Sequence, residues 1–150
     1  MADNAMTVRQ RALAYLARRE YTRDELARKL APHCEDEDEI AALLEDFQQR
    51  GWLSEQRFIE QTVHARQARF GSRRIAHELK EKGVSAEAIE AALPQLKESE
   101  LETARAVWQK KFGRPPEGAS ERAKQMRFLM SRGFGMETIR RVMQGNAEEE

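Results

Sequence analysis

Apolar residues along this chain recur every three or four positions, which is the spacing of one face of an α-helix. Val8, Ala12 and Leu16 form the first such series and predict a helix that ends near Glu20. Similar series continue to the last residues, and none shows the alternation of a β-strand. The pattern therefore predicts an all-α fold of about nine helices.

Capping sequences indicate where several helices begin. Thr22 and Glu25 have the spacing of a capping box, in which each side chain bonds the other residue's backbone amide. Ser99 and Glu102 have the same spacing and predict the start of a later helix.

Proline and glycine indicate where helices end. A short helix that begins at Ser85 should end at Leu93, because Pro94 disfavours helical geometry in the residue before it. Residues 113–118, which hold two glycines and two prolines, predict a loop.

Three glycines have the same surroundings: Gly51, Gly83 and Gly133. Each follows a cation and precedes an apolar residue, and each has an apolar residue four positions before it and a glutamate four positions after it. Such glycines cap helix ends in the left-handed conformation. Aligned as equivalent points, they predict three tandem three-helix repeats in an elongated array, with boundaries at residues 1–53, 54–97 and 98–150. The third repeat should end in a short disordered acidic tail.

Charge is unevenly distributed although the net charge is zero, with 26 basic and 26 acidic residues. Residues 57–82 carry a net charge of +4 and residues 105–141 a net charge of +7, whereas residues 35–46 hold seven acids and no base. Exposed charges are screened beyond roughly 8 Å at physiological salt, so local excess matters more than the sum. Zero net charge is therefore a weak argument against an anionic partner.

Several classes of protein are disfavoured. Cys34 is the single cysteine, so no intrachain disulfide is possible and a reducing cytoplasm is expected. No stretch approaches the roughly 20 apolar residues of a membrane span, and residues 1–7 lack the apolar core of a signal peptide. No dedicated dimerisation segment is present, so we expect a cytoplasmic monomer without a membrane association.

Two basic series are candidates for binding DNA or a filament. The first could converge on phosphate with help from helix amides near Ser72, and the alternative is a solvated face: Arg66, Arg69, Arg73 and Arg74. The second is denser, and we favour a functional surface because unopposed like charges repel: Lys110, Lys111, Arg114, Arg122, Lys124, Arg127, Arg132, Arg140 and Arg141.

The aromatic residues could stack on bases, as in single-strand binders: Tyr15, Trp52, Trp108, Phe112 and Phe134. Trp52 and Phe134 directly follow capping glycines, where an apolar residue usually packs back on its helix. We therefore expect the aromatic residues to lie in the core.

Catalytic and metal sites are not indicated. The soft ligands His33, Cys34, His64 and His77 lack zinc-site spacing. There is no Gly-x-Ser-x-Gly turn, no glycine-rich phosphate loop and no recognisable base beside Cys34. We expect no cofactor, no metal and no enzymatic activity.

Four stretches carry a distinctive combination of residues: Leu13, Tyr15, Leu16, Arg18, Thr22, Glu25, Leu26, Lys29 and Leu30; Gly51, Trp52, Leu53, Ser54, Glu55, Arg57 and Phe58; Gly71, Ile75, Glu78, Leu79, Lys82, Gly83, Val84, Ile89 and Leu93; Leu129, Arg132, Gly133, Phe134 and Ile139. On these residues, nearly the whole chain resembles the RecX family of regulators of the RecA recombinase. Two features depart from the family pattern. Glu55 stands where Asp is common, and the acidic run at residues 35–39 is unusual.

The resemblance implies a modular array of three-helix repeats that binds in the groove of the RecA filament on DNA. It implies inhibition of RecA ATPase, strand exchange and coprotease activity, in recombination, DNA repair and the SOS response. DNA would be contacted as part of that filament or weakly alone. The alternative is an independent helix-turn-helix protein that reads base edges with one short helix.

Overall fold

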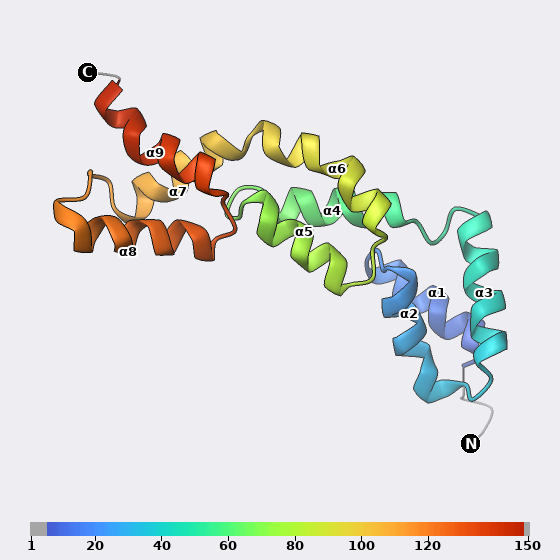
Figure 1. Cartoon of the computed structure of the whole chain (residues 1–150). Helices are drawn as coiled ribbons and strands as arrows, with labels where there is room; N and C mark the ends of the chain where they lie inside the picture. The colour runs from blue at the N-terminus through green and yellow to red at the C-terminus, as the bar shows by residue number, and fades with distance from the viewer. Residues whose placement is uncertain (1–5, 149–150) are drawn as a thin grey trace.

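Helices are the only regular elements within residues 6–148, which are the residues that the computed structural model describes (Figure 1). In chain order they are α1 (Val8–Arg18), α2 (Arg23–Leu30), the 3₁₀ turn η2 (Ala31–His33), α3 (Glu37–Gln49), α4 (Glu55–Arg66), α5 (Ser72–Glu81), α6 (Ala86–Glu98), α7 (Glu100–Lys111), α8 (Gly118–Ser131) and α9 (Met136–Glu148). The prediction of an all-α fold with nine helices is confirmed for this part of the chain.

The helices form three units that follow one another in an elongated array (Figure 1). Unit 1 comprises α1–α3, unit 2 comprises α4–α6 and unit 3 comprises α7–α9, and each buries its own apolar cluster. Phe47, Leu79 and Leu129 are fully buried examples from the three clusters. Burial of a large apolar side chain contributes about 1.5–3 kcal/mol, so each unit is stabilised mainly from within.

Both predicted helix starts are confirmed, but only one of the two predicted capping boxes forms. Thr22 and Glu25 form the reciprocal capping box at the start of α2. Ser99 precedes α7 as predicted, but its side chain makes no capping hydrogen bond, so the predicted box with Glu102 is wrong. The neighbouring Glu100 turns its carboxylate inward instead and is buried.

Two predicted helix ends also differ. Pro94 lies inside α6, which continues to Glu98, so the prediction that this helix ends at Leu93 is wrong. Proline removes one backbone donor, and the burial of Leu96 in the core of unit 2 favours continuing the helix. The backbone of α9 extends to Glu148, and residues 149–150 of the predicted disordered tail lie outside the described residues.

The three aligned glycines all adopt the left-handed conformation, with φ of +76° at Gly51, +91° at Gly83 and +90° at Gly133. Gly51, however, follows α3, the third helix of unit 1, whereas Gly83 and Gly133 follow α5 and α8, the second helices of their units. The alignment of Gly51 with the other two is therefore wrong. The common sequence reflects the chemistry of a helix end and not an equivalent place in a repeat.

The second helices of the units meet end to end at two joints. At the first joint, between units 1 and 2, the Thr22 hydroxyl at the start of α2 donates to the Lys82 carbonyl at the end of α5. At the second joint, between units 2 and 3, the Gly71 amide donates to the Arg132 carbonyl at 2.8 Å. The Arg73 amide donates to the Gly133 carbonyl at 3.1 Å. The same contact, a helix start against a glycine-capped helix end, thus recurs along the array.

Both joints require glycine. A Cβ atom on Gly83 would overlap the Asp24 side chain, and one on Gly133 would overlap Arg74. Gly51, at the end of α3, has no atom within 4 Å of the position where its Cβ would be. Close approach between units therefore depends on Gly83 at the first joint and on Gly133, with Gly71 opposite it, at the second.

Ionic contacts supplement the first joint. Arg57 of α4 pairs with Glu20 at 2.9 Å, and Lys82 pairs with Glu25 at 3.4 Å. Burial raises the pKa of Glu25, but hydrogen bonds from Arg19 and the Thr22 amide, with the charges of Arg19 and Lys82, outweigh burial. The pKa of Glu25 consequently lies below its ordinary value of 4.5.

Replacing Gly133 with alanine should cost more stability than replacing Gly51. Both variants place a side chain in the left-handed region, which costs about 1–3 kcal/mol of stability. Gly133→Ala alone also forces Cβ into Arg74, and such overpacking costs about 1–3 kcal/mol more. Urea unfolding of the two variants measures the difference. Equal losses would contradict the requirement for close approach at the second joint.

Stability should fall in acid partly through Glu25. Because its folded pKa is lowered, its contribution is present above pH 4.5 and is lost as the pH falls through the folded pKa. Glu25→Gln should therefore have a lower free energy of unfolding than the parent protein at pH 7. This difference should become smaller below pH 4.5. Urea unfolding across pH 7 to 3 tests this, with the exposed Glu102→Gln as control. A difference in the free energy of unfolding that does not change with pH would contradict this role of Glu25.

Candidate nucleic-acid interface at the second joint

Cations that are distant in sequence gather around one aromatic ring at the second joint. The guanidinium carbon lies 4.4 Å from the centre of the Phe70 ring for Arg74, and 5.5 Å for both Arg69 and Arg132. Arg132 also lies 5.2 Å from the ring of Phe128, and the Lys111 ammonium lies 5.5 Å from it. We refer to this group as the Phe70 cluster; its members are Arg69, Phe70, Arg74, Lys111, Phe128 and Arg132.

The backbone of the joint positions the cluster. Phe70 lies in the turn between α4 and α5, where its amide donates to the Arg66 carbonyl at 3.0 Å. Arg74 lies in the first turn of α5, and Arg132 is the residue that caps the end of α8. Since the two helix ends are joined by backbone hydrogen bonds, cations of units 2 and 3 face one ring.

The cluster carries unopposed positive charge. Among residues 6–144, whose side chains the structure describes, no ion pair with a carboxylate involves its three arginines or Lys111. Arg74 donates one hydrogen bond to the Ser131 carbonyl at 3.1 Å. Each contact of a cation with a ring at an exposed site contributes only about 0.5–1 kcal/mol. An anion with several acceptor oxygens would satisfy donors that remain open.

The predicted help from helix amides near Ser72 is wrong. The amides of Gly71 and Arg73 already donate to carbonyls of the second joint. The Ser72 amide and hydroxyl both donate to the Glu100 carboxylate, at 2.8 and 2.9 Å. Glu100 also accepts from Thr138 of α9 at 3.4 Å. The start of α5 is thus closed by a buried carboxylate, and the guanidinium groups alone are left to hold an anion.

The other predicted cations do not join the cluster. Arg66 pairs with Glu78 at 3.1 Å, and Arg140 pairs with Glu137 at 2.7 Å. Arg73 lines a separate cleft of about 1180 Å³ between α5, α6 and the start of α9. The rest are exposed on unit 3: Lys110, Arg114, Arg122, Lys124, Arg127 and Arg141.

The aromatic residues divide between core and surface. Phe134 and Trp108 are buried, at 1% and 3% exposure, as predicted. Trp52 is 41% exposed, so its prediction as a core residue is wrong; it packs by its edge on Phe47 and lies under Arg50. Tyr15 and Phe112 are half-buried.

Phe70 and Phe128 were missed by the sequence reasoning, although Phe70 stands among four arginines in the sequence. Aromatic residues interleaved with basic ones are the signal that could have pointed to the cluster.

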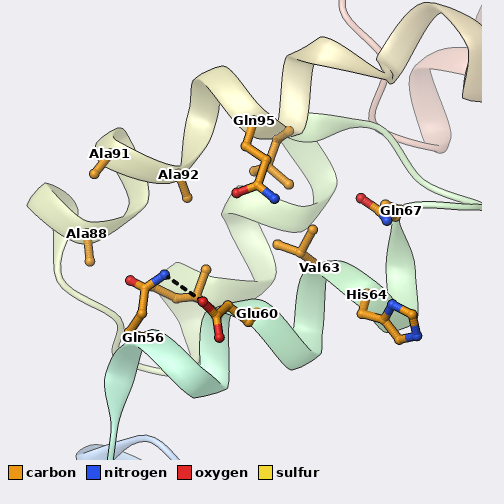
Figure 2. A pocket seen from close by; sticks show the side chains of 11 residues that line it. Gln56, Glu60, Val63, His64, Gln67, Ala88, Ala91, Ala92 and Gln95 are labelled. Atoms are coloured by element: carbon orange, nitrogen blue, oxygen red, sulfur yellow. Dashed lines mark hydrogen bonds between the residues drawn. The ribbon is translucent and has the colours of Figure 1, made fainter.

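The pocket between α4 and α6 is lined mainly by alanine, glutamine and aliphatic side chains, with Glu60 and His64 as its titratable residues (Figure 2). Its volume is about 380 Å³, and no serine, threonine, cysteine or lysine lines it. Its Gln56 amide donates to Glu60 at 3.4 Å (Figure 2). The side chains that the structure describes, those of residues 6–144, contain no group of three His, Cys, Asp or Glu residues that could hold a metal ion.

The chemistry of Cys34 is unfavourable for a nucleophile. Desolvation raises the pKa of its thiol, and the nearby Glu39 carboxylate, 3.3 Å from Sγ, raises it further. A thiol becomes reactive when its pKa is lowered, so Cys34 has the opposite environment.

Comparison with known proteins identifies the family. The family models for the first, second and third three-helix domains of RecX match residues 9–47, 54–93 and 98–143. The regulatory protein RecX of Leptothrix cholodnii is 51% identical over 95% of this chain and 92% of its own length. The chain belongs to the RecX family. RecX of Ralstonia nicotianae is 46% identical over 93% of this chain and 88% of its own length.

Solved RecX structures share the fold. The crystal structure of RecX from Lactobacillus salivarius matches with a TM-score of 0.82 at 20% identity, over 97% of each chain. The predicted three-helix RecX architecture is therefore confirmed. None of the helices in the described part of this RecX family member combines the length and the apolar character that a membrane span requires.

The departure at Glu55 has a structural role in this RecX family member. Its carboxylate accepts from the Ser85 amide at 3.0 Å and from the Ser85 hydroxyl at 3.3 Å. Ser85 also accepts from the Ala88 amide at the start of α6. Glutamate at this position therefore joins the start of α4 to the start of α6.

Removal of the Glu100 carboxylate should destabilise the second joint. Glu100→Ala leaves the buried Ser72 amide and hydroxyl without their acceptor, at a cost of about 1–3 kcal/mol. Glu100→Gln keeps an acceptor oxygen and should lose less, and the exposed Glu102→Ala is the matched control. Urea unfolding measures all three, and equal stability of Glu100→Ala and the control would refute the proposed role.

Proposed function

We propose that this protein regulates RecA by binding its nucleoprotein filament in the cytoplasm as a monomer. Bound in this way it inhibits ATP hydrolysis, strand exchange and coprotease activity, without changing a covalent bond. Membership of the RecX family supports a regulatory role, because the relatives are named regulatory proteins. Regulation of recombination, DNA repair and the SOS response would follow from control of RecA.

The observation that carries the proposal is the end-to-end array of three units (Figure 1), together with the uneven distribution of charge along the chain. A filament presents the same surfaces repeatedly along its axis, and an elongated array can contact more than one of them. The acidic start of α3 suits a basic protein surface, whereas the Phe70 cluster suits an anion. A protein with zero net charge could therefore bind a basic protein surface through α3 and an anion through the Phe70 cluster.

A helix-turn-helix reader is less well supported. Such a protein places the first residues of its recognition helix against base edges, beside the phosphates. The third helix of each unit begins instead with acidic residues: Glu37, Asp38 and Glu39 in α3, Glu87 in α6 and Glu137 in α9. Repulsion between these carboxylates and DNA phosphate disfavours specific readout by those helices.

Addition of the protein should lower the rate of RecA ATP hydrolysis on single-stranded DNA. A steady-state ATPase assay over a range of ratios up to one protein per RecA measures this. Gly133→Ala, which disturbs the second joint, should inhibit less than Gly51→Ala if the array must keep its shape. An unchanged rate of ATP hydrolysis at equal concentrations of this protein and RecA would refute the proposal.

The helix-turn-helix alternative is tested by filter binding to specific and random duplexes. A protein of that class should show a strong preference between them.

A further inference from the structure

We infer that the Phe70 cluster is a binding site for single-stranded nucleic acid, in which arginines of units 2 and 3 hold the same strand. The inference deepens the proposed function, on which it rests for its setting, because it assigns this surface to the strand inside the filament. Strand binding itself can be measured without RecA.

The cations of the cluster match a phosphodiester. Three of the four are arginines, whose planar groups offer paired donors to phosphate oxygens. In the described part of the chain, the side chains of Arg69 and Arg132 donate no hydrogen bond, and that of Arg74 donates only to Ser131. Most guanidinium donors are therefore open to an anionic ligand.

The rings distinguish a nucleic-acid strand from an acidic protein surface. Phe70 and Phe128 are half-buried, so part of each ring remains accessible among the cations. Unpaired bases stack on aromatic rings and on guanidinium planes, at about 1–3 kcal/mol per base. Carboxylates of a protein would gain charge pairing but no stacking. In a duplex the bases are already stacked, so a single strand gains more from the rings.

Because the cations come from two units, strand binding should stabilise the joint between those units. Arg69 and Arg74 belong to unit 2, whereas Arg132 and Lys111 belong to unit 3. A phosphate held by both groups opposes separation of the units at the second joint. The amides of Gly71 and Arg73, which cross this joint, should consequently exchange their hydrogens more slowly when a strand is bound.

The test is fluorescence anisotropy of a labelled oligothymidylate, without RecA and across a salt series. The test variant is Arg74→Gln with Arg132→Gln. The control, Arg18→Gln with Arg28→Gln, removes the same charge from exposed arginines of unit 1. The test variant should bind about tenfold more weakly, as expected for lost charge-assisted hydrogen bonds. The slope of log affinity against log salt concentration should become shallower by about 1.4, because each of the two lost phosphate contacts contributes ~0.7.

A further variant and a second ligand distinguish base stacking on the rings from charge attraction. Phe70→Leu keeps an apolar side chain but removes the aromatic face, and it should weaken strand binding while leaving the salt dependence unchanged. A duplex of the same length should bind more weakly than the strand. Circular-dichroism melting confirms that each variant is folded, and hydrogen exchange at Gly71 and Arg73 reports on the second joint.

Three outcomes would overturn the inference. The parent protein could fail to bind the strand, or the test and control variants could lose equal affinity, which would indicate general charge attraction. Alternatively, the test variant could bind the strand normally but the RecA filament poorly in co-sedimentation, which would assign the cluster to the protein surface of RecA. In each case the ATPase assay decides the proposed function separately.

Discussion

The array depends on the contact between the start of one second helix and the glycine-capped end of the next. At the second joint, carbonyls of Arg132 and Gly133 accept from amides of Gly71 and Arg73, so the open donors of one helix meet the open acceptors of another. The missing Cβ of Gly133 permits this approach. The first joint repeats the arrangement with Gly83 and the Thr22 hydroxyl. These contacts set how neighbouring units are placed against each other and hence the elongated shape.

Stability and shape consequently have different sources. Each unit encloses its own apolar cluster, whereas the joints are made largely of hydrogen bonds and ion pairs. A net contribution of about 0.5–1.5 kcal/mol per hydrogen bond is small beside the burial within a unit. Buried Glu100 strengthens the second joint, because one carboxylate accepts from Ser72 of unit 2 and Thr138 of unit 3. The two joints thus hold three separately packed units together, largely by polar contacts.

The Phe70 cluster is a product of the second joint. Arg74 and Arg132 meet only because the start of α5 lies against the end of α8, and the ring of Phe70 lies near both. The same joint occupies the helix amides that could have bound an anion, which leaves recognition to side chains. In the proposed mode of binding, contact with the ligand and alignment of units 2 and 3 would occur at the same place.

The sequence by itself determined the features that depend on neighbouring residues. Helical periodicity, the Thr22 and Glu25 capping box and the left-handed glycines at helix ends all involve contacts within a few positions. Tertiary structure decided the rest. It placed Gly51 outside the joints, kept α6 helical through Pro94, and turned Glu100 toward Ser72 in place of the box expected at Ser99. It also selected Arg69, Arg74, Lys111 and Arg132 from thirteen candidate cations that look alike in sequence. Such outcomes depend on packing between distant segments, which local periodicity and spacing do not encode.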